Sequence, residues 1–399
     1  MKLGKDLLLI SFLLANSFTW YYTIRALLMQ VTTSITVDES ILVNGAFFAA
    51  VIASSLLGAV LSKRVNAVRI IGAWLFSGFV TATIPLIFSA SSASGLSIMA
   101  LLFGLSFGIG MPACLALFSD LTGFEKRGIT SGTTFLVTNL VVVVFAFLSN
   151  DLTAIILVSL VWRVSGLCAF LLLKPKETEH TKEEIAYSFK LAIQNRTFVL
   201  YAVPWLIFSL VDRFTRIYAG ALFEQNVFEF NQFVEPVVGI IFVFLGGLFA
   251  DRIGRKRIVT YGFVALGVGY AFIGLAPYSD ISRYFYTLMD GVAWGIFMVV
   301  YMLILWGDVT PLHQASELYY ALGSIPFFLS DLLALFLRQY IQGIAQVSAY
   351  AIFSIAAFFL FLAVLPLMFA PETLPEKNIK DRELKGYIEK AKKIKEKHT

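Results

Sequence analysis

Twelve long apolar stretches, each bounded by charged, Gly or Pro residues, constrain the fold of this 399-residue chain more than any other feature. About 20 apolar residues suffice for a helix to cross the hydrocarbon layer of a membrane, where the helix satisfies its own backbone amides and carbonyls. The sequence therefore predicts an all-α polytopic membrane protein. Its twelve transmembrane helices are expected at about 7–30, 41–62, 70–90, 96–119, 131–149, 153–173, 197–222, 232–250, 258–277, 284–306, 317–340 and 346–370.

The first apolar stretch is interpreted as a span rather than as a signal peptide. It is long, it carries Arg25, and no small-residue cleavage site follows it. Only 14% of the residues are charged, against about a quarter in soluble domains, so little of the chain remains for a soluble domain.

The basic residues lie almost entirely on one side of the predicted spans. If the N-terminus is cytoplasmic, Lys and Arg fall in the cytoplasmic loops and tails, and essentially only Arg283 lies in an external connection. Because Lys and Arg favour the cytoplasmic side, we expect a multi-pass protein of the cell membrane with both termini cytoplasmic. The net charge of +5 then reports orientation and does not indicate a nucleic-acid partner. The external connections are expected to hold Asp38, Glu39, Asp151, Glu229, Glu235 and Asp280.

The sequence gives no pattern typical of an enzyme or of a cofactor or metal site. Cys114 and Cys168 both lie in apolar stretches, which supports neither a disulfide framework nor a thiolate metal site. No Gly-rich phosphate loop precedes a Lys-Ser/Thr pair. The three histidines lie in segments predicted to be cytoplasmic, which excludes an imidazole proton relay inside the membrane; they are His180, His313 and His398.

The two halves of the chain align at an offset of 188 residues, the separation of Asp120 and Asp308. The same offset pairs Thr122 with Thr310 and Arg25 with Arg213. Such an internal repeat predicts two bundles related by an axis along the membrane normal. We expect a six-helix bundle at 1–173, a cytoplasmic linker with an amphipathic helix at 174–196, a second six-helix bundle at 197–371 and a charged cytoplasmic tail at 372–399.

A loop in the second half carries a specific motif, which reads Gly247-Leu-Phe-Ala-Asp251-Arg252-Ile-Gly254-Arg255-Lys256. Gly247 permits close helix approach, Asp251 can meet a helix N-terminus, and Gly254 allows a tight turn. This loop resembles the signature loop of the major facilitator superfamily. The equivalent loop of the first half has Ser62 where that family has Asp, so a gating contact like that of Asp251 is not expected from this position.

The resemblance covers the whole twelve-span pattern and implies a secondary transporter that alternates access to a central site. A single chain suffices for that mechanism, so a monomer is expected, with membrane lipids and a small-molecule substrate as partners. In this family spans one, four, seven and ten line the cavity. Because an ionisable residue inside a membrane is costly unless it faces a cavity or a partner, these spans single out Arg25, Asp212, Arg213, Arg216 and Asp290.

The first span predicts an anion-binding face. Phe18, Tyr21, Tyr22, Arg25 and Met29 recur at three- and four-residue spacing, and a guanidinium fork suits a carboxylate or a phosphate. The stretch Tyr21–Arg25 also resembles the organophosphate/phosphate antiporter branch, which implies that Arg25 and Arg213 hold an anion. Alternatively, Arg25 snorkels to the outer interface, and Asp212 and Arg216 only neutralise each other.

Two substrate classes remain open. The favoured one is a small organic or phosphorylated anion held by Arg25, Arg213, Arg216, Tyr21 and Tyr22. The alternative is a sugar or drug-like solute driven by protons that Asp290, Asp331 or Asp212 carry. The coupling partner would then be a proton or a counter-transported anion. A membrane sensor that does not transport is a third and more distant hypothesis.

Overall fold

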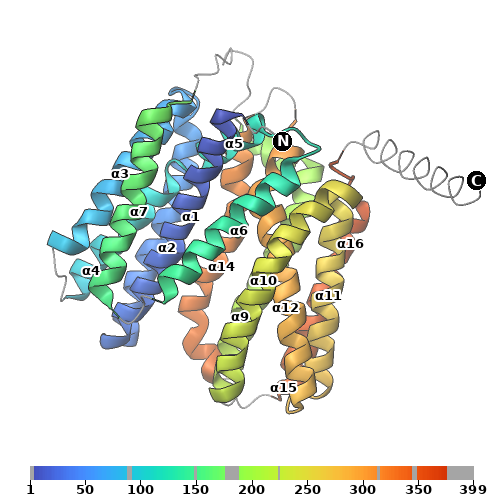
Figure 1. The fold of residues 1–399 in the computed structure, drawn as a ribbon. Helices are drawn as coiled ribbons and strands as arrows, with labels where there is room; N and C mark the ends of the chain where they lie inside the picture. Colours follow the sequence, from blue (N-terminus) through green and yellow to red (C-terminus); the bar gives the residue numbers. More distant parts are fainter. Residues whose placement is uncertain are drawn as a thin grey trace, which may run out of the picture.

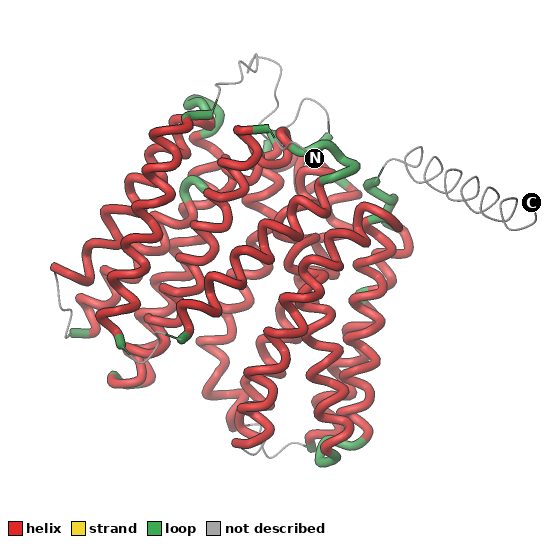
Figure 2. Tube along the Cα trace, viewed as in Figure 1, coloured by secondary structure: helices red, strands yellow, loops and turns green. Residues whose placement is uncertain are grey.

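The computed structural model describes residues 4–87, 92–147, 151–175, 188–222, 225–311, 315–343 and 348–374, which form helices joined by short loops (Figure 2). Among these residues, 12 helices are long and apolar enough to cross a membrane, and each overlaps one predicted span. The predicted fold class is confirmed. The elements are α1 (Lys5–Val31), η1 (Thr32–Ser34), α2 (Val37–Leu61), α3 (Ala67–Ile87), α4 (Ala93–Gly108), α5 (Met111–Leu121), α6 (Arg127–Ala146), α7 (Leu152–Leu173), α8 (Phe189–Gln194), α9 (Arg196–Leu222), α10 (Gln225–Ile253), α11 (Arg255–Leu275), α12 (Asp280–Val299), η3 (Val300–Ile304), α13 (Leu305–Val309), α14 (Ser316–Gly343), α15 (Ala349–Leu362) and α16 (Val364–Phe369).

The helices form two bundles that lie side by side (Figure 1). In the first half, α1 packs on α6 and α7, and α2 packs on α4; in the second half, α9 packs on α14, and α12 packs on α10 and α11. The halves meet along two seams, α2 with α14 and α6 with α10. In the internal repeat, α2 corresponds to α10 and α6 corresponds to α14. The α2–α14 seam therefore corresponds to the α10–α6 seam.

Local sequence explains where several helices begin. Thr36 and Glu39 form a reciprocal capping box at the start of α2, and the Asp151 side chain accepts hydrogen bonds from two amides at the start of α7. Large apolar side chains such as Phe147 and Leu172 stay exposed on the outside of the bundles. An apolar outer surface is what a helix needs toward lipid.

The fourth and tenth spans are both interrupted. The fourth breaks between α4 and α5 at Ile109 and Gly110, and the tenth contains the π-helical turn Val300–Ile304 between α12 and α13. At Gly110 an added Cβ would lie 2.2 Å from the Trp74 ring, so this position requires glycine. Turns of this kind bend a helix, and here they bend corresponding spans of the two halves.

The predicted amphipathic linker helix is described only over α8, Phe189–Gln194. Phe189 and Ile193 are exposed there, while Ile185 lies outside the described residues. The charged tail from residue 375 and the three histidines also lie outside them. The start of α1 and the end of α16 lie at the same end of the bundles (Figure 1). Because successive spans alternate in direction, the loops that carry Lys63 and Lys126 lie at that end too. We call it the basic end.

Candidate functional site

A cavity of about 740 Å³ lies between the two halves. It is lined by α1, α2 and α6 of the first half and by α9, α10, α12 and α14 of the second. The lining extends to Thr32, Ser40 and Leu335, which lie toward the end opposite the basic end. The cavity therefore faces that opposite end in this conformation.

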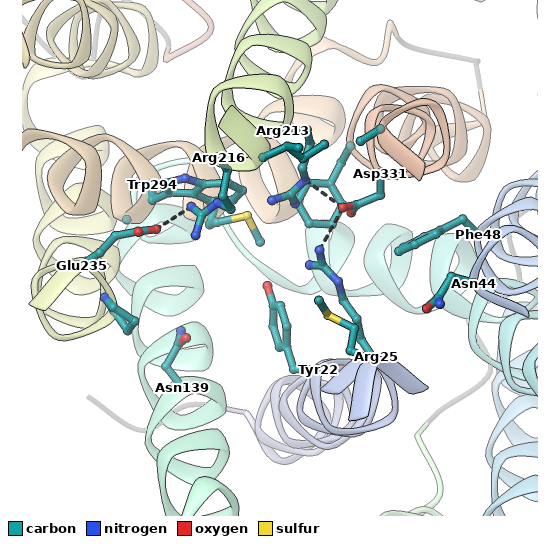
Figure 3. Close-up of a pocket in the computed structure, with 18 of the residues that line it drawn as sticks. Tyr22, Arg25, Asn44, Phe48, Asn139, Arg213, Arg216, Glu235, Trp294 and Asp331 are labelled. Carbon is teal, nitrogen blue, oxygen red and sulfur yellow. Dashed lines mark hydrogen bonds and ion pairs between the residues drawn. The ribbon is translucent and has the colours of Figure 1, made fainter. Parts of the chain in front are cut away.

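One carboxylate joins the two symmetry-related arginines at the centre of the cavity (Figure 3). Asp331 Oδ1, on α14, lies 2.8 Å from Arg25 Nη2 on α1 and 2.8 Å from Arg213 Nε on α9. The Asp331 side chain is 5% exposed, and its Oδ2 has no hydrogen-bond partner among the described residues. Arg25 and Arg213 therefore meet at a shared anionic group, as their pseudo-symmetric positions suggested.

A second charged group surrounds Arg216, on the next turn of α9. Its Nη2 lies 2.7 Å from Glu235 Oε1, 3.5 Å from Asp212 Oδ1 and 3.9 Å from Asp290 Oδ2. Asp212 Oδ1 also accepts a hydrogen bond of 2.9 Å from Trp294 Nε1. Arg216 thus lies among three carboxylates, one of which, Asp212, also pairs with the neighbouring arginine of α9.

Among the described residues, the ion-pair network at the cavity and behind its wall holds one more acidic group than basic groups. The ion-pair network contains three guanidiniums and four carboxylates. All four carboxylates come from the second half, whereas the first half contributes Arg25 and the neutral polar side chains of Asn44 and Asn139. With every group ionised, the network would therefore carry one net negative charge.

Aromatic rings surround the arginines. The Cζ atom of Arg213 lies 5.2 Å from the ring centroids of Trp294 and Phe327, and that of Arg25 lies 5.9 Å from the centroid of Phe48. Rings at these distances attract a guanidinium through their faces and also present apolar surface to a ligand. The cavity can therefore contact both a charged group and an apolar body.

Two sequence-based placements need correction. Tyr22 lines the cavity beside Arg25, but Tyr21 does not, because its buried ring packs on Phe47, Phe107 and Phe328. The helical spacing placed both tyrosines near one face, although neighbouring residues differ by about 100° around a helix.

Glu235 was expected in an external connection. It lies inside α10, lines the cavity and binds Arg216. The span predicted at 232–250 already included Glu235, so its assignment to an external connection conflicted with that span, and α10 itself begins at Gln225. The available signal was a carboxylate inside a predicted span, which is costly unless it faces a cavity or a partner.

Asp290 lies behind the cavity wall and is only 2% exposed. Its Oδ2 accepts a hydrogen bond of 3.4 Å from the Tyr286 hydroxyl, whereas its Oδ1 has no partner in the described part of the chain. Of the four carboxylates, Asp290 has the weakest contact with a cation, because Arg216 is 3.9 Å away.

Arg163, on α7, lies in the core of the first bundle and not in the cavity lining. Its Nη1 donates to Asn16 Oδ1 at 3.2 Å and to Ser17 Oγ at 2.8 Å. Its guanidinium lies 4.9 Å from the ring centroid of Trp20, and Gly78 packs directly against it. These contacts join α7 to α1 and α3, which favours a structural role for this arginine over a role in transport.

The signature loop closes the basic end. Asp251, near the end of α10, accepts hydrogen bonds of 2.8 Å from the backbone amides of Gly128 and Ile129, at the start of α6 in the other half. Gly128 and Gly247 lie so close together that a Cβ on Gly247 would be 2.2 Å from Gly128 O. We call these contacts, with the Asp308 contacts described next, the latch.

Asp308 adds a second connection between the halves. Its carboxylate pairs with Arg127 of the first half and, at 2.9 Å, with Arg255 Nε of the second. Glu372 accepts a hydrogen bond of 2.8 Å from the Arg255 amide, next to Gly254, whose φ of 107° suits glycine. The motif residues Arg252 and Lys256 lie at the same loop, and Lys256 donates to Met368 O.

The first half contributes no equivalent acidic group. Ser62, in the position of Asp251, donates its hydroxyl to Gly58 O of its own helix. Asp120, the counterpart of Asp308, is exposed. The acidic groups of the latch, Asp251 and Asp308, therefore come from the second half alone within the described residues. The same residues contain no cluster of three or more His, Cys, Asp or Glu side chains that could hold a metal ion.

Comparisons with known proteins agree with this geometry. A family model described as Major Facilitator Superfamily matches residues 7–330. Among solved structures, the human organic anion transporter MFSD10 (TETRAN) is similar with a TM-score of 0.66 and 13% sequence identity, over 91% of this chain and 99% of that chain. At that identity the likeness concerns the fold alone. No curated protein matches the chain.

Proposed function

Because the chain belongs to the major facilitator superfamily, we propose that it is a secondary active transporter of small organic anions that works by alternating access. The observation that supports this most is the shared carboxylate of Asp331. Its oxygen lies 2.8 Å from both Arg25 and Arg213, one from each half. A position that already holds one carboxylate between two guanidiniums has the geometry to hold the carboxylate or phosphate of a substrate.

The rest of the cavity favours an organic anion over an inorganic one. Trp294, Phe327 and Phe48 surround the arginines, and Met29 and Met298 add soft apolar surface. A volume of about 740 Å³ is far larger than a bare phosphate needs and is in the range of sites for drug-sized molecules. The fold that the chain shares with a solved organic anion transporter is consistent with this choice.

We assign the basic end to the cytoplasm, because Lys and Arg favour that side. The cavity then faces outward, and the latch is the closed cytoplasmic gate. Opening this gate requires Asp251 to leave Gly128 and Ile129 while the cavity closes on the other side. Such rocking of two repeats about a central site is how folds of this kind alternate access.

The direct test is uptake into proteoliposomes of wild-type protein. Radiolabelled aromatic carboxylates, phosphate esters, sugars and amines are compared, and only the anions are expected to accumulate. Arg25→Lys and Arg213→Lys should lower anion uptake at least about tenfold, because the forked geometry is lost. Arg257→Lys, at an exposed position of the basic end, is the control and should transport normally. Uptake of sugars or amines that survives both cavity substitutions would reject the anion assignment.

A specific observation also favours proton coupling. Asp290 is buried, one of its oxygens has no partner in the described residues, and the network holds four carboxylates to three guanidiniums. A proton on Asp290 would make the network neutral. Its transfer across the membrane with the substrate would make the carrier an anion–proton symporter.

A further inference from the structure

The two arginines of the proposed anion site are neutralised by a carboxylate of the chain itself. Arg25 belongs to the first half and Arg213 to the second, and both bind the same oxygen of Asp331. Asp331 is the only carboxylate paired with Arg25 among the described residues, because Asp212, Glu235 and Asp290 gather around Arg213 and Arg216. Neutralisation of the Arg25 charge therefore depends on Asp331.

Closure of the cavity brings the two bundles together around this point. Without an anion between them, two guanidiniums on opposite bundles would repel each other in a site that excludes water, where charges are poorly screened. A substrate anion removes that repulsion in the loaded carrier. In the empty carrier, the Asp331 carboxylate removes the same repulsion.

We propose that Asp331 takes the place of the substrate anion in the empty transporter, so that the chain reorients without a load and performs net transport instead of obligatory exchange. This inference rests on the proposed anion site. It makes the Asp331 carboxylate a built-in competitor of the substrate: the incoming anion must displace it from Arg25 and Arg213 to bind, and Asp331 returns when the anion leaves.

The geometry of Asp331 suits such an exchange of partners. Only Oδ1 binds the arginines, and Oδ2 makes no hydrogen bond in the described residues. Arg25 donates through a single nitrogen and keeps 24% of its side chain exposed to the cavity. An anion entering from the open end can therefore reach Arg25 before Asp331 moves away.

The test measures reorientation of the empty protein and needs no ligand. Fluorophores are placed at Val37→Cys and Tyr278→Cys, two exposed positions at the open ends of the two halves. Exposed Cys168 is replaced by Ser, and buried Cys114 is kept. Single-molecule energy transfer in nanodiscs then gives the rate of interconversion between open and closed distances.

Wild-type protein is expected to interconvert when empty. Asp331→Asn keeps the shape of the side chain but removes the charge, and it should slow interconversion at least about tenfold, with the open distance favoured. Arg25→Met combined with Asp331→Asn removes the repelling charge as well and should restore the rate. This restoration separates electrostatics from loss of packing.

Three results would overturn the inference. They are an empty wild type fixed in one state, Asp331→Asn protein that interconverts at the wild-type rate, and a double variant that stays slow. None of them bears on whether anions bind, because no anion is present. A wrong anion assignment would instead appear in the uptake of sugars or amines by Arg25→Lys protein.

Discussion

Asp251 accepts a hydrogen bond of 2.8 Å from the backbone amide of Gly128, and this contact joins the end of α10 in one half to the start of α6 in the other. The same carboxylate accepts the next amide, that of Ile129, at 2.8 Å. A carboxylate at a helix N-terminus is favoured by the unpaired amides and by the helix dipole. Asp251 therefore stabilises the conformation in which the basic end is closed.

Asp251→Asn should open the basic end. The amide side chain keeps the shape but loses the charge, and hydrogen bonds to charged groups are worth about 1.5–3 kcal/mol. We expect the ratio of closed to open protein to fall roughly tenfold. Spin labels at the exposed positions Lys63→Cys and Arg257→Cys report this as a longer distance between the halves. Ser62→Ala, at the equivalent position of the first half, should leave the distance distribution unchanged. An identical distribution in Asp251→Asn protein would contradict the latch.

Gly247→Ala tests the close approach of the same two helices. Its Cβ would lie 2.2 Å from Gly128 O, a backbone atom that cannot turn away. The start of α6 must then separate from α10, and the amides of Gly128 and Ile129 should exchange hydrogen for deuterium at least about tenfold faster. Gly45→Ala is the control at the other seam, where Leu332 Cδ1 lies 3.8 Å from the added Cβ. If the Gly128 and Ile129 amides of Gly247→Ala protein exchange at the wild-type rate, the close approach at Gly247 is not required to hold α6 against α10.

Gly78→Ala should destabilise the first bundle without affecting the cavity. The added Cβ would lie 2.0 Å from Arg163 Nη2, and the guanidinium is held by Asn16 and Ser17. Overpacking of this kind costs about 1–3 kcal/mol, so the melting temperature of the purified protein should fall. Gly123→Ala, which has no heavy atom within 4 Å of the added Cβ, should melt like wild type. A loss of anion affinity in folded Gly78→Ala protein would assign Arg163 to the transport pathway instead.

Asp290→Asn separates proton coupling from anion binding. The amide cannot carry a proton across the membrane, so anion accumulation driven by an inward proton gradient should fall at least about tenfold. Exchange of internal for external anion at equal pH should continue, because Arg25 and Arg213 are intact. Asp280→Asn, whose side chain is 69% exposed, is the control for loss of an acidic group. Gradient-driven accumulation that persists in Asp290→Asn protein would remove Asp290 from the coupling mechanism.

The sequence predicted the twelve spans and the latch loop because both depend on local patterns. Span length follows from the thickness of the membrane, and the spacing from Gly247 to Lys256 fixes a turn between two helices. The repeat also related Arg25 to Arg213 without any knowledge of their contacts. Each of these inferences needs only the order of residues along the chain.

The sequence did not predict the partner of the two arginines. Asp331 was a candidate for carrying protons, but which side of α14 faces the cavity depends on how the two bundles dock. Glu235 was placed in an external connection, because its pairing with Arg216 of α9 cannot be seen in the order of residues. Tyr21 was assigned to the cavity, although the packing of its ring among Phe47, Phe107 and Phe328 turns it away. Contacts between distant segments decided all three.

The measurement that tests the central proposal most directly is a structure of the outward-facing protein in nanodiscs with its preferred organic anion bound. We predict that the carboxylate or phosphate group lies about 2.7–2.9 Å from nitrogens of both Arg25 and Arg213. Asp331 should then have moved off at least one of them. A ligand bound elsewhere in the cavity, with Asp331 still joined to both arginines, would contradict the proposal.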